Sequence, residues 1–351
     1  MKNIKKTRLG AENYSRKYKF NGPRALGLLK SLPVATDPVE AVLLFAEMLV
    51  IESGMTEPPF APARYAPLRR IHQILFNDME VDGRLIPVEN GFIVELKKNQ
   101  SHERKNFTLA HEVSHTFFHG AVPVTKYKMN GPTTSDFDPE EERLCDIAAS
   151  ELLMPSLTFS AIAKDYLASP SSVIKIAALF ETSTLATIIK LLQLNIWDAT
   201  FVLWDLFEGQ LRAKWVASVH RSVMYNSKLN IPDFKSSGVY ETLISGKSTD
   251  GFEYLSREEG FNRSYAQSVL LNSSSALTCF TRSRIVRDLF ICENPASLIT
   301  SFEHTCVCDG GGWVHKTEGK YSHLVRCPAK VHKRSVPSPT FRINLHTFHS
   351  I

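Results

Sequence analysis

The segment from Phe107 to His119 constrains the fold and chemistry of this chain more than any other. It contains the pattern His111-Glu112-x-x-His115. On an α-helix, residues at i and i+4 project from the same face, so both imidazoles can bind one tetrahedral Zn²⁺. Glu112 follows the first histidine and can reach a metal-bound water as a general base. The pattern therefore predicts that the chain hydrolyses a peptide bond.

A five-residue pattern also arises by chance, and the alternative is a solvated helix with two surface histidines. The surrounding apolar residues favour a helix packed in the core, because they recur at helical spacing. Histidines buried so close together need partners, and a metal ion meets that need. The apolar residues are Phe107, Leu109, Ala110, Val113, Phe117 and Phe118.

A second helix is predicted over residues 138–154, with Pro139 in its first turn and Pro155 ending it. A catalytic zinc takes three protein ligands and leaves one position open, so a third ligand is needed. Glu142 and Asp146 stand at i and i+4 on this helix. We assign Glu142 as the third ligand. We assign Asp146 as the carboxylate that accepts a hydrogen bond from a ligand histidine.

Three neighbours of Glu142 offer alternatives. Glu140 and Glu141 are rival third ligands, but we expect them to form a solvated acidic first turn, which suits the helix dipole. The same solvated turn is the alternative interpretation of Glu142. Cys145 lies about 100° around the helix from Asp146, and we expect it to be a small buried thiol rather than a ligand.

Together, the two segments resemble the ImmA/IrrE metallopeptidase family. The resemblance rests on Phe107-Thr-Leu-Ala-His-Glu-x-x-His-x-x-x-x-His119 and Glu142-Arg-Leu-Cys-Asp-x-Ala-Ala-x-Glu-Leu-Leu-Met-Pro155, and it covers roughly residues 65–195. It implies a zincin-like fold in which His111, His115 and Glu142 hold one Zn²⁺ and Glu112 is the catalytic base.

The resemblance also implies a substrate class. Characterised members cleave helix-turn-helix repressors and so release transcription, in mobile-element control or stress responses. This chain has no clear repressor domain of its own, so it is expected to cleave such a repressor in trans.

Two residues of the first segment are compared with the family pattern individually. Ser114 stands just before the second motif histidine, where members more often carry glycine. His119 matches a frequent family position on the helical face of His111 and His115, and we interpret it as structural.

Composition indicates a globular protein of the cytoplasm, without a membrane partner. The hydrophobic content of 43% suits a sizeable core, and the net charge is a modest +5. Six scattered cysteines are too few for a disulfide scaffold and indicate a reducing compartment. The basic N-terminus lacks the apolar core of a signal peptide, and the longest apolar run, residues 41–51, is too short to span a bilayer.

The fold class is predicted to be α+β, in three parts. Residues 1–36 read as a basic N-terminal segment that is expected to be mobile. Residues 37–198 read as the zincin-like metallopeptidase domain. Residues 199–351 read as a C-terminal α+β domain, for which a sensory or regulatory role is one expectation. This last domain is predicted to open with strands over residues 200–206 and 210–218, which flank Glu208-Gly209.

Three elements are predicted early in the peptidase domain. Asp37-Pro38 begins a helix that runs to about Ile51, and a short helix follows near residues 68–76. Residues 85–96 form a hairpin that turns at Asn90-Gly91. One strand of this hairpin either binds substrate by strand addition or belongs simply to the sheet core, and the sequence leaves both open.

The segment 169–194 is predicted to form a helix-turn-helix-like pair. DNA recognition is one interpretation, but Lys190 is the only basic residue of the second helix, so packing beside the peptidase core is favoured.

Near the C-terminus, Cys306, Cys308 and Cys327 lie among histidines and are candidate ligands of a second metal ion. The basic residues around them suit a solvated tail or contact with nucleic acid.

Two other functions remain open. The first is a DNA-binding regulator whose zinc is structural, although His-Glu-x-x-His with a downstream Glu leaves an open coordination position and supplies a base. The second is a toxin-antitoxin or phage-defence protease that is gated by its C-terminal domain.

Overall fold

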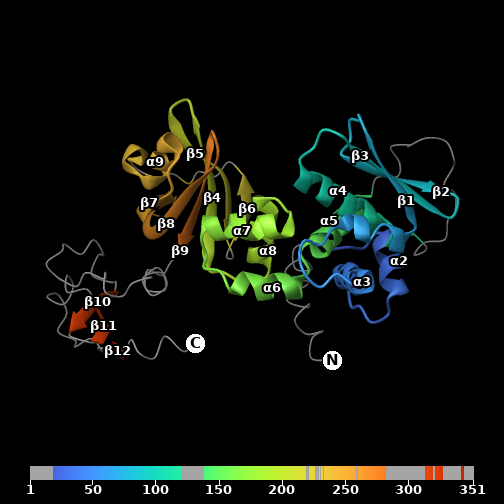
Figure 1. Ribbon diagram of the computed structural model, residues 1–351, viewed down its shortest axis with the longest axis horizontal. Helices are drawn as coiled ribbons and strands as arrows, with labels where there is room; N and C mark the ends of the chain where they lie inside the picture. Colours follow the sequence, from blue (N-terminus) through green and yellow to red (C-terminus); the bar gives the residue numbers. More distant parts are fainter. Residues whose placement is uncertain are drawn as a thin grey trace.

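The structure is a computed structural model that describes residues 19–119, 138–218, 221–225, 229, 231, 233–257, 260–281, 313–318, 321–326 and 341–343. Helices and sheets occur together in it, which confirms the α+β class (Figure 1). Among the helices in these ranges, none is by itself both long and apolar enough to cross a bilayer.

Helix α3 (Pro38–Ser53) begins where the sequence predicts. The Asp37 side chain caps it by accepting a hydrogen bond of 2.9 Å from the Glu40 amide. Gly54 ends it in the left-handed conformation, with φ of 70°. The buried apolar residues of α3 belong to the main core, and the helix packs against α5 (Pro139–Leu153).

A further helix, α2 (Pro23–Ser31), precedes α3 and corrects the expectation of a mobile segment over residues 1–36. Ala25 and Leu28 of α2 are fully buried in the main core. Helix α2 packs against both α3 and α5. The expectation is therefore wrong for residues 23–31, whereas residues 1–18 lie outside the described part of the chain.

The first sheet has the strand order β1-β3-β2. Strands β2 (Gly83–Val88) and β3 (Gly91–Lys97) form the predicted hairpin, with Asn90 at a φ of 63° in the turn. Strand β1 (Ile71–Asn77) runs parallel to β3. The short helix expected at residues 68–76 is therefore wrong. Its apolar spacing suits a helix, but backbone pairing with β3 prevails, and only the short 3-10 turns η1 (Pro62–Arg64) and η2 (Pro67–Arg69) precede the strand.

Helix α4 (His102–His115) carries the two histidines of the motif and packs against α5. Ser101 caps its start, and the helix ends at His115, earlier than the predicted course to His119. The chain turns at Thr116, and the His119 ring packs against Phe92 in a tilted arrangement with centroids 4.6 Å apart. His119 is therefore not on the helical face of the two motif histidines.

Three helices follow α5: α6 (Ser156–Lys164), α7 (Pro170–Phe180) and α8 (Thr184–Gln193). The axes of α7 and α8 meet at a bend of 103°. Lys190 of α8 is buried and its Nζ lies 2.6 Å from Glu151 Oε2 of α5. Phe180 of α7 stacks on Phe60 and packs against Phe159 in a tilted arrangement. The pair therefore packs beside the peptidase core, and the one basic residue of α8 faces inward.

A six-stranded antiparallel sheet follows, with the order β6-β5-β4-β9-β8-β7. Its strands are β4 (Ala199–Phe207), β5 (Gln210–Ser218), β6 (Arg221–Tyr225), β7 (Thr249–Arg257), β8 (Gly260–Asn272) and β9 (Ser275–Thr281). The first two match the strands predicted at residues 200–206 and 210–218. The turn η3 (Phe234–Ser236) and helix α9 (Gly238–Ser245) lie between β6 and β7.

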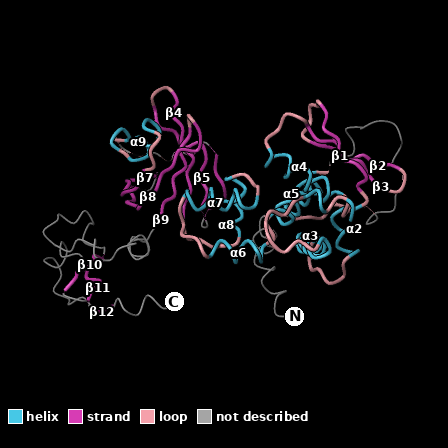
Figure 2. The backbone as a smooth tube through the Cα atoms, in the orientation of Figure 1, coloured by secondary structure: helices cyan, strands magenta, loops and turns pink. Residues whose placement is uncertain are grey.

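The two faces of this sheet pack against different helices. Phe201 of β4 joins the main core, which includes residues of α7 and α8. Val202 and Trp204 point the other way and join Val239 of α9 in a second cluster. Figure 2 shows helices α6–α8 between this sheet and the helices α3–α5. Because the main core extends from Phe20 to Cys279, the division at residue 198 stays a prediction.

A third sheet has the order β10-β11-β12, with β10 (Trp313–Glu318), β11 (Tyr321–Arg326) and β12 (Phe341–Ile343). All of its pairings are antiparallel. The cysteines proposed for a second metal site, Cys306, Cys308 and Cys327, lie outside the described residues.

The packing of α2 can be tested by shortening one buried side chain. Leu28→Ala should lower the free energy of unfolding by about 2–5 kcal/mol, because it leaves a cavity at a fully buried position. Leu26→Ala on the same helix is the matched control, since Leu26 is 41% exposed, and it should cost only about 0.5 kcal/mol. Chemical denaturation measures both. Equal small losses would contradict the packing of α2.

Candidate metal centre

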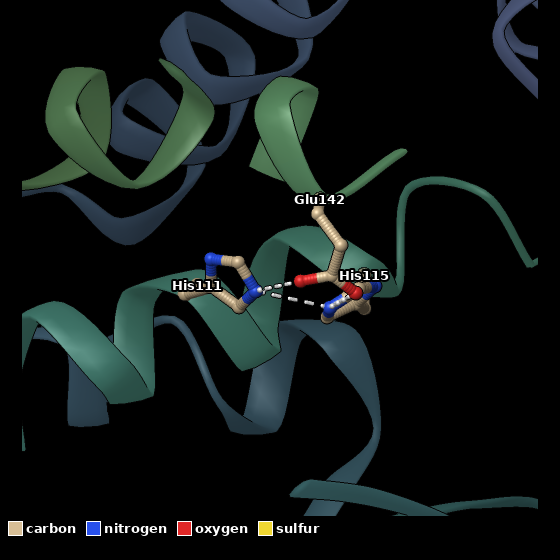
Figure 3. Close-up of side chains that lie close together, drawn as sticks. All are labelled: His111, His115 and Glu142. Carbon is tan, nitrogen blue, oxygen red and sulfur yellow. Dashed lines mark hydrogen bonds and ion pairs between the residues drawn. The ribbon is translucent and has the colours of Figure 1, made fainter. Parts of the chain in front are cut away.

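Three side chains from two helices converge on one point (Figure 3). His111 and His115 lie one turn apart on α4, and their Nε2 atoms are 3.1 Å apart. Glu142 of α5 faces both rings: its Oε2 lies 3.2 Å from His111 Nε2 and its Oε1 lies 3.6 Å from His115 Nε2. One atom from each side chain lies within 4.8 Å of the others. Two imidazole nitrogens and one carboxylate oxygen are donors compatible with a metal ion.

The opposite nitrogen of each imidazole is held by a second carboxylate of α5. His111 Nδ1 donates to Asp146 Oδ1 over 2.9 Å, and His115 Nδ1 donates to Glu141 Oε1 over 2.7 Å. A carboxylate accepts, so these bonds place the ring proton on Nδ1. Each Nε2 is then available on the side of Glu142. Asp146 therefore lies where the sequence predicts.

The solvated acidic first turn expected for Glu140 and Glu141 is wrong. Glu141 is buried, and its two oxygens are shared between His115 Nδ1 and the Arg24 guanidinium of α2. Glu140 Oε2 accepts a hydrogen bond of 2.7 Å from the Gly22 amide. Both glutamates therefore connect α5 to the N-terminal helix. The sequence carries no local signal for these contacts, because Arg24 and Gly22 lie far upstream.

Cys145 belongs to a second group of donor atoms, together with His115 and Glu141. It is fully buried, and burial raises the pKa of its thiol well above the ordinary range. Metals bind the thiolate rather than the thiol, so this group suits a metal less well. His115 Nδ1 and Glu141 are also already bonded to each other. The buried position of Cys145 is the one predicted.

A cavity lies beside the two histidines, and Glu112 is one of the residues that line it. Glu112 is 6% exposed. Burial raises the pKa of its carboxyl, although the neighbouring charges of His115 and His111 act in the opposite direction. The cavity has a volume of about 390 Å³. It is lined by Asp82, Gly83, Arg104, Phe107, Thr108, His111, Glu112, His115, Glu142 and Asp146.

Charge at the donors depends on their mutual hydrogen bonds. Burial lowers the pKa of His111, but its hydrogen bonds with Asp146 and Glu142 outweigh that effect and raise the pKa to about 10. The hydrogen bond with His111 lowers the pKa of Glu142. Burial raises the pKa of Glu141, yet its hydrogen bonds with His115 and Arg24 prevail and lower it. A cation that binds here must displace a proton from His111.

Two further residues of the motif have clear structural roles. Ser114, which stands where glycine is more common in the family, is fully buried, and its hydroxyl donates to the Ala110 carbonyl over 2.7 Å. The small side chain thus fits without an unsatisfied polar group. His119 packs against Phe92 and belongs to neither donor group found among the described residues.

Gly83 allows strand β2 to approach α4 at Glu112. A Cβ at this position would lie 2.4 Å from Thr108 Cγ2 and 2.9 Å from Glu112 Oε1. No side chain larger than hydrogen fits there without displacing the strand or the carboxylate. Sequence reasoning did not identify Gly83, because a glycine that begins a strand carries no signal for contact with a helix.

Gly83→Ala should lower the free energy of unfolding by about 1–3 kcal/mol, because the added methyl group overpacks the contact between β2 and α4. Gly251→Ala in β7 is the matched control, since a Cβ there meets no atom within 4 Å. Urea denaturation of the metal-free proteins measures both changes. A Gly83→Ala protein as stable as the control would show that β2 does not approach Glu112 this closely.

Comparisons with known proteins bear on the same region. Residues 69–192 match a peptidase-family model described as the IrrE N-terminal-like domain. A comparison with curated proteins gives no match. Among solved structures, a Mycobacterium tuberculosis transcriptional regulator is similar with 11% identity and a TM-score of 0.40, over 68% of this chain and 86% of that chain.

The family match spans both helices that carry the converging donors, His111 and His115 on α4 and Glu142 on α5, and it includes the hairpin beside them. A match to a peptidase family agrees with a buried carboxylate placed next to a group of metal donors. The match at residues 69–192 to the IrrE N-terminal-like domain thus confirms the resemblance to the ImmA/IrrE family for this part of the chain.

Proposed function

We propose that this protein is a zinc-dependent endopeptidase, with His111, His115 and Glu142 as zinc ligands and Glu112 as general base. One observation carries the proposal: two Nε2 atoms and a carboxylate oxygen face one point, while the buried Glu112 lines the same cavity. Three protein donors that leave the fourth position to a water or substrate are the ligand set of a catalytic zinc rather than a structural one.

A bound Zn²⁺ would act as a Lewis acid and lower the pKa of the attacking water to about 7. Glu112, which lines the same cavity, would take up a proton from the attacking water and donate it to the leaving amine. Its burial favours proton uptake, because desolvation raises the pKa of the carboxyl. Asp146 and Glu141 hold the protons of the imidazoles on Nδ1, which keeps both Nε2 atoms available.

The surroundings of the cavity support an extended peptide as substrate. Strand β2 is at one edge of the first sheet, and its first residue, Gly83, lies against Glu112. A second cavity of about 650 Å³ lies at the other end of β2. Its lining includes Pro87, Val88 and Gly91 from the hairpin and Thr116 and His119 beyond the end of α4.

The two cavities therefore lie at opposite ends of β2, along the course of α4. A peptide that adds to the edge of β2 would reach both. This arrangement favours strand addition over a role of the hairpin in the sheet core alone. A helix-turn-helix repressor cleaved in trans is the substrate that the ImmA/IrrE resemblance implies, and we adopt it as part of the proposal.

Regulation by the C-terminal part is a second candidate, and the position of α8 favours it. Lys190 joins α8 to Glu151 near the end of α5, and the same helix packs against β5 of the C-terminal sheet. A shift of that sheet would thus act on the helix that carries Glu142. DNA binding by the helix pair α7–α8 has less support, because Lys190 is buried in an ion pair and offers nothing to a phosphate.

A comparison of protein N-termini in cells tests the substrate. Cells that express the wild-type chain should contain one or a few new termini within a helix-turn-helix repressor, and cells that express Glu112→Gln should lack them. New termini confined to proteins of another class would refute repressor cleavage while supporting the protease. Identical profiles before and after stress or mobile-element induction would speak against proteolysis in the cell.

Purified Glu112→Gln tests the general base on the substrate found in this way. Cleavage should fall by about 100-fold or more, because the proton acceptor is lost. The dissociation constant for Zn²⁺ should stay close to that of the wild type, since Glu112 is not among the converging donors. Glu103→Gln makes the same charge change on α4 outside the cavity and should cleave normally. Normal cleavage by Glu112→Gln would exclude this mechanism.

A further inference from the structure

We propose that Arg24, in the N-terminal helix α2, is a positioning residue for the metal centre. Its guanidinium holds Glu141, and Glu141 in turn fixes the ring of His115. The inference rests on the zinc site of the proposed function. It adds a residue that lies outside the peptidase-family match at residues 69–192.

The contacts form a continuous series from α2 to the metal donors. Arg24 Nη1 pairs with Glu141 Oε2. The other oxygen of the same carboxylate, Oε1, accepts from His115 Nδ1 over 2.7 Å. The Nε2 of that ring faces Glu142 and His111. The orientation of one metal donor therefore depends on a carboxylate that is itself held by Arg24.

The carboxylates that hold the two imidazoles differ in what compensates their negative charge. The Asp146 side chain, which holds His111, is 57% exposed, so water can solvate its charge. The Glu141 side chain, which holds His115, is only 5% exposed. A buried carboxylate is costly unless a charged partner and hydrogen bonds compensate for the lost solvation. Arg24 supplies that compensation for Glu141, and water does so for Asp146.

The start of α2 is docked closely enough to hold Arg24 in place. The Gly22 amide donates to Glu140 Oε2, and a Cβ on Gly22 would lie 2.9 Å from that oxygen. On the next turn, Ala25 and Leu28 are buried in the main core. The adjacent residues Glu140 and Glu141 of α5 thus bind the N-cap residue of α2, Gly22, and Arg24 in its first turn.

Zinc affinity of the full-length protein tests this role. The variants are Arg24→Gln, Arg24→Lys, Glu141→Gln and the double variant Arg24→Gln/Glu141→Gln. Lys30→Gln is the matched control, because it removes one positive charge from an exposed position of the same helix. Competition with a chelator gives the dissociation constant for Zn²⁺, and the melting temperature of each metal-free protein reports on folding.

Arg24→Gln should weaken zinc binding by about 10- to 100-fold, the range for residues that orient metal ligands. Arg24→Lys should recover part of the loss, since an ammonium can donate to one carboxylate oxygen but not in the planar manner of a guanidinium. In the Glu141→Gln background, Arg24→Gln should change zinc affinity less than about twofold, because both act through one pathway. Lys30→Gln should bind zinc like the wild type.

Three results would overturn the proposal: unchanged zinc affinity in Arg24→Gln, an effect of Arg24→Gln that is undiminished by Glu141→Gln, or an equal loss in Lys30→Gln. If Arg24→Gln does not fold, Arg24→Lys serves in its place in the same cycle. Zinc affinity is measured without substrate, so a wild type that binds zinc but cleaves nothing would contradict the peptidase proposal alone. A wild type that binds no zinc would contradict both.

Discussion

The contact between α4 and α5 is the interaction on which the rest of the site depends. Two imidazoles of α4 meet three carboxylates of α5: Asp146 and Glu141 accept hydrogen bonds from the Nδ1 atoms, and Glu142 faces both Nε2 atoms. Polar groups that lose contact with solvent must be paired with one another or with a cation, and the buried Glu141 and the half-buried imidazoles are paired in this way. This pairing leaves the two Nε2 atoms and one carboxylate oxygen of Glu142 directed at the same point, an arrangement compatible with a bound metal ion.

Both ends of α5 are fixed by parts of the chain that lie outside that contact. At its start, Glu140 and Glu141 bind α2 through Gly22 and Arg24. Near its end, Glu151 accepts hydrogen bonds from Ser156 and forms the buried ion pair with Lys190 of α8. The helix that carries Glu142 is therefore held between the N-terminal helix and the helix pair next to the C-terminal sheet. Contacts of α5 therefore connect the candidate metal centre to α2 on the N-terminal side and to α8 on the C-terminal side.

The parts of the site that follow from spacing within one helix were predictable from the sequence. His111 and His115 are one turn apart on α4, and Glu142 and Asp146 are one turn apart on α5, so the helical period alone brings each pair to one face. The contacts of Glu141 were not predictable, because one of them is an ion pair with Arg24, which is distant in sequence. In the same way, β1 has the apolar spacing of a helix and becomes a strand only through its pairing with β3. The spacing of residues within each helix therefore predicted the candidate metal donors, whereas contacts between distant segments determine which side chains hold those donors in place.

A crystal structure of the zinc-loaded protein, with anomalous data at the zinc absorption edge, tests the central claim most directly. The account predicts one zinc peak bonded to His111 Nε2, His115 Nε2 and a carboxylate oxygen of Glu142, at distances of about 2.0–2.2 Å. It also predicts that Glu141 remains bonded to His115 Nδ1. A zinc peak at about 2.3 Å from Cys145 Sγ, with Glu141 as a further ligand, would contradict the account.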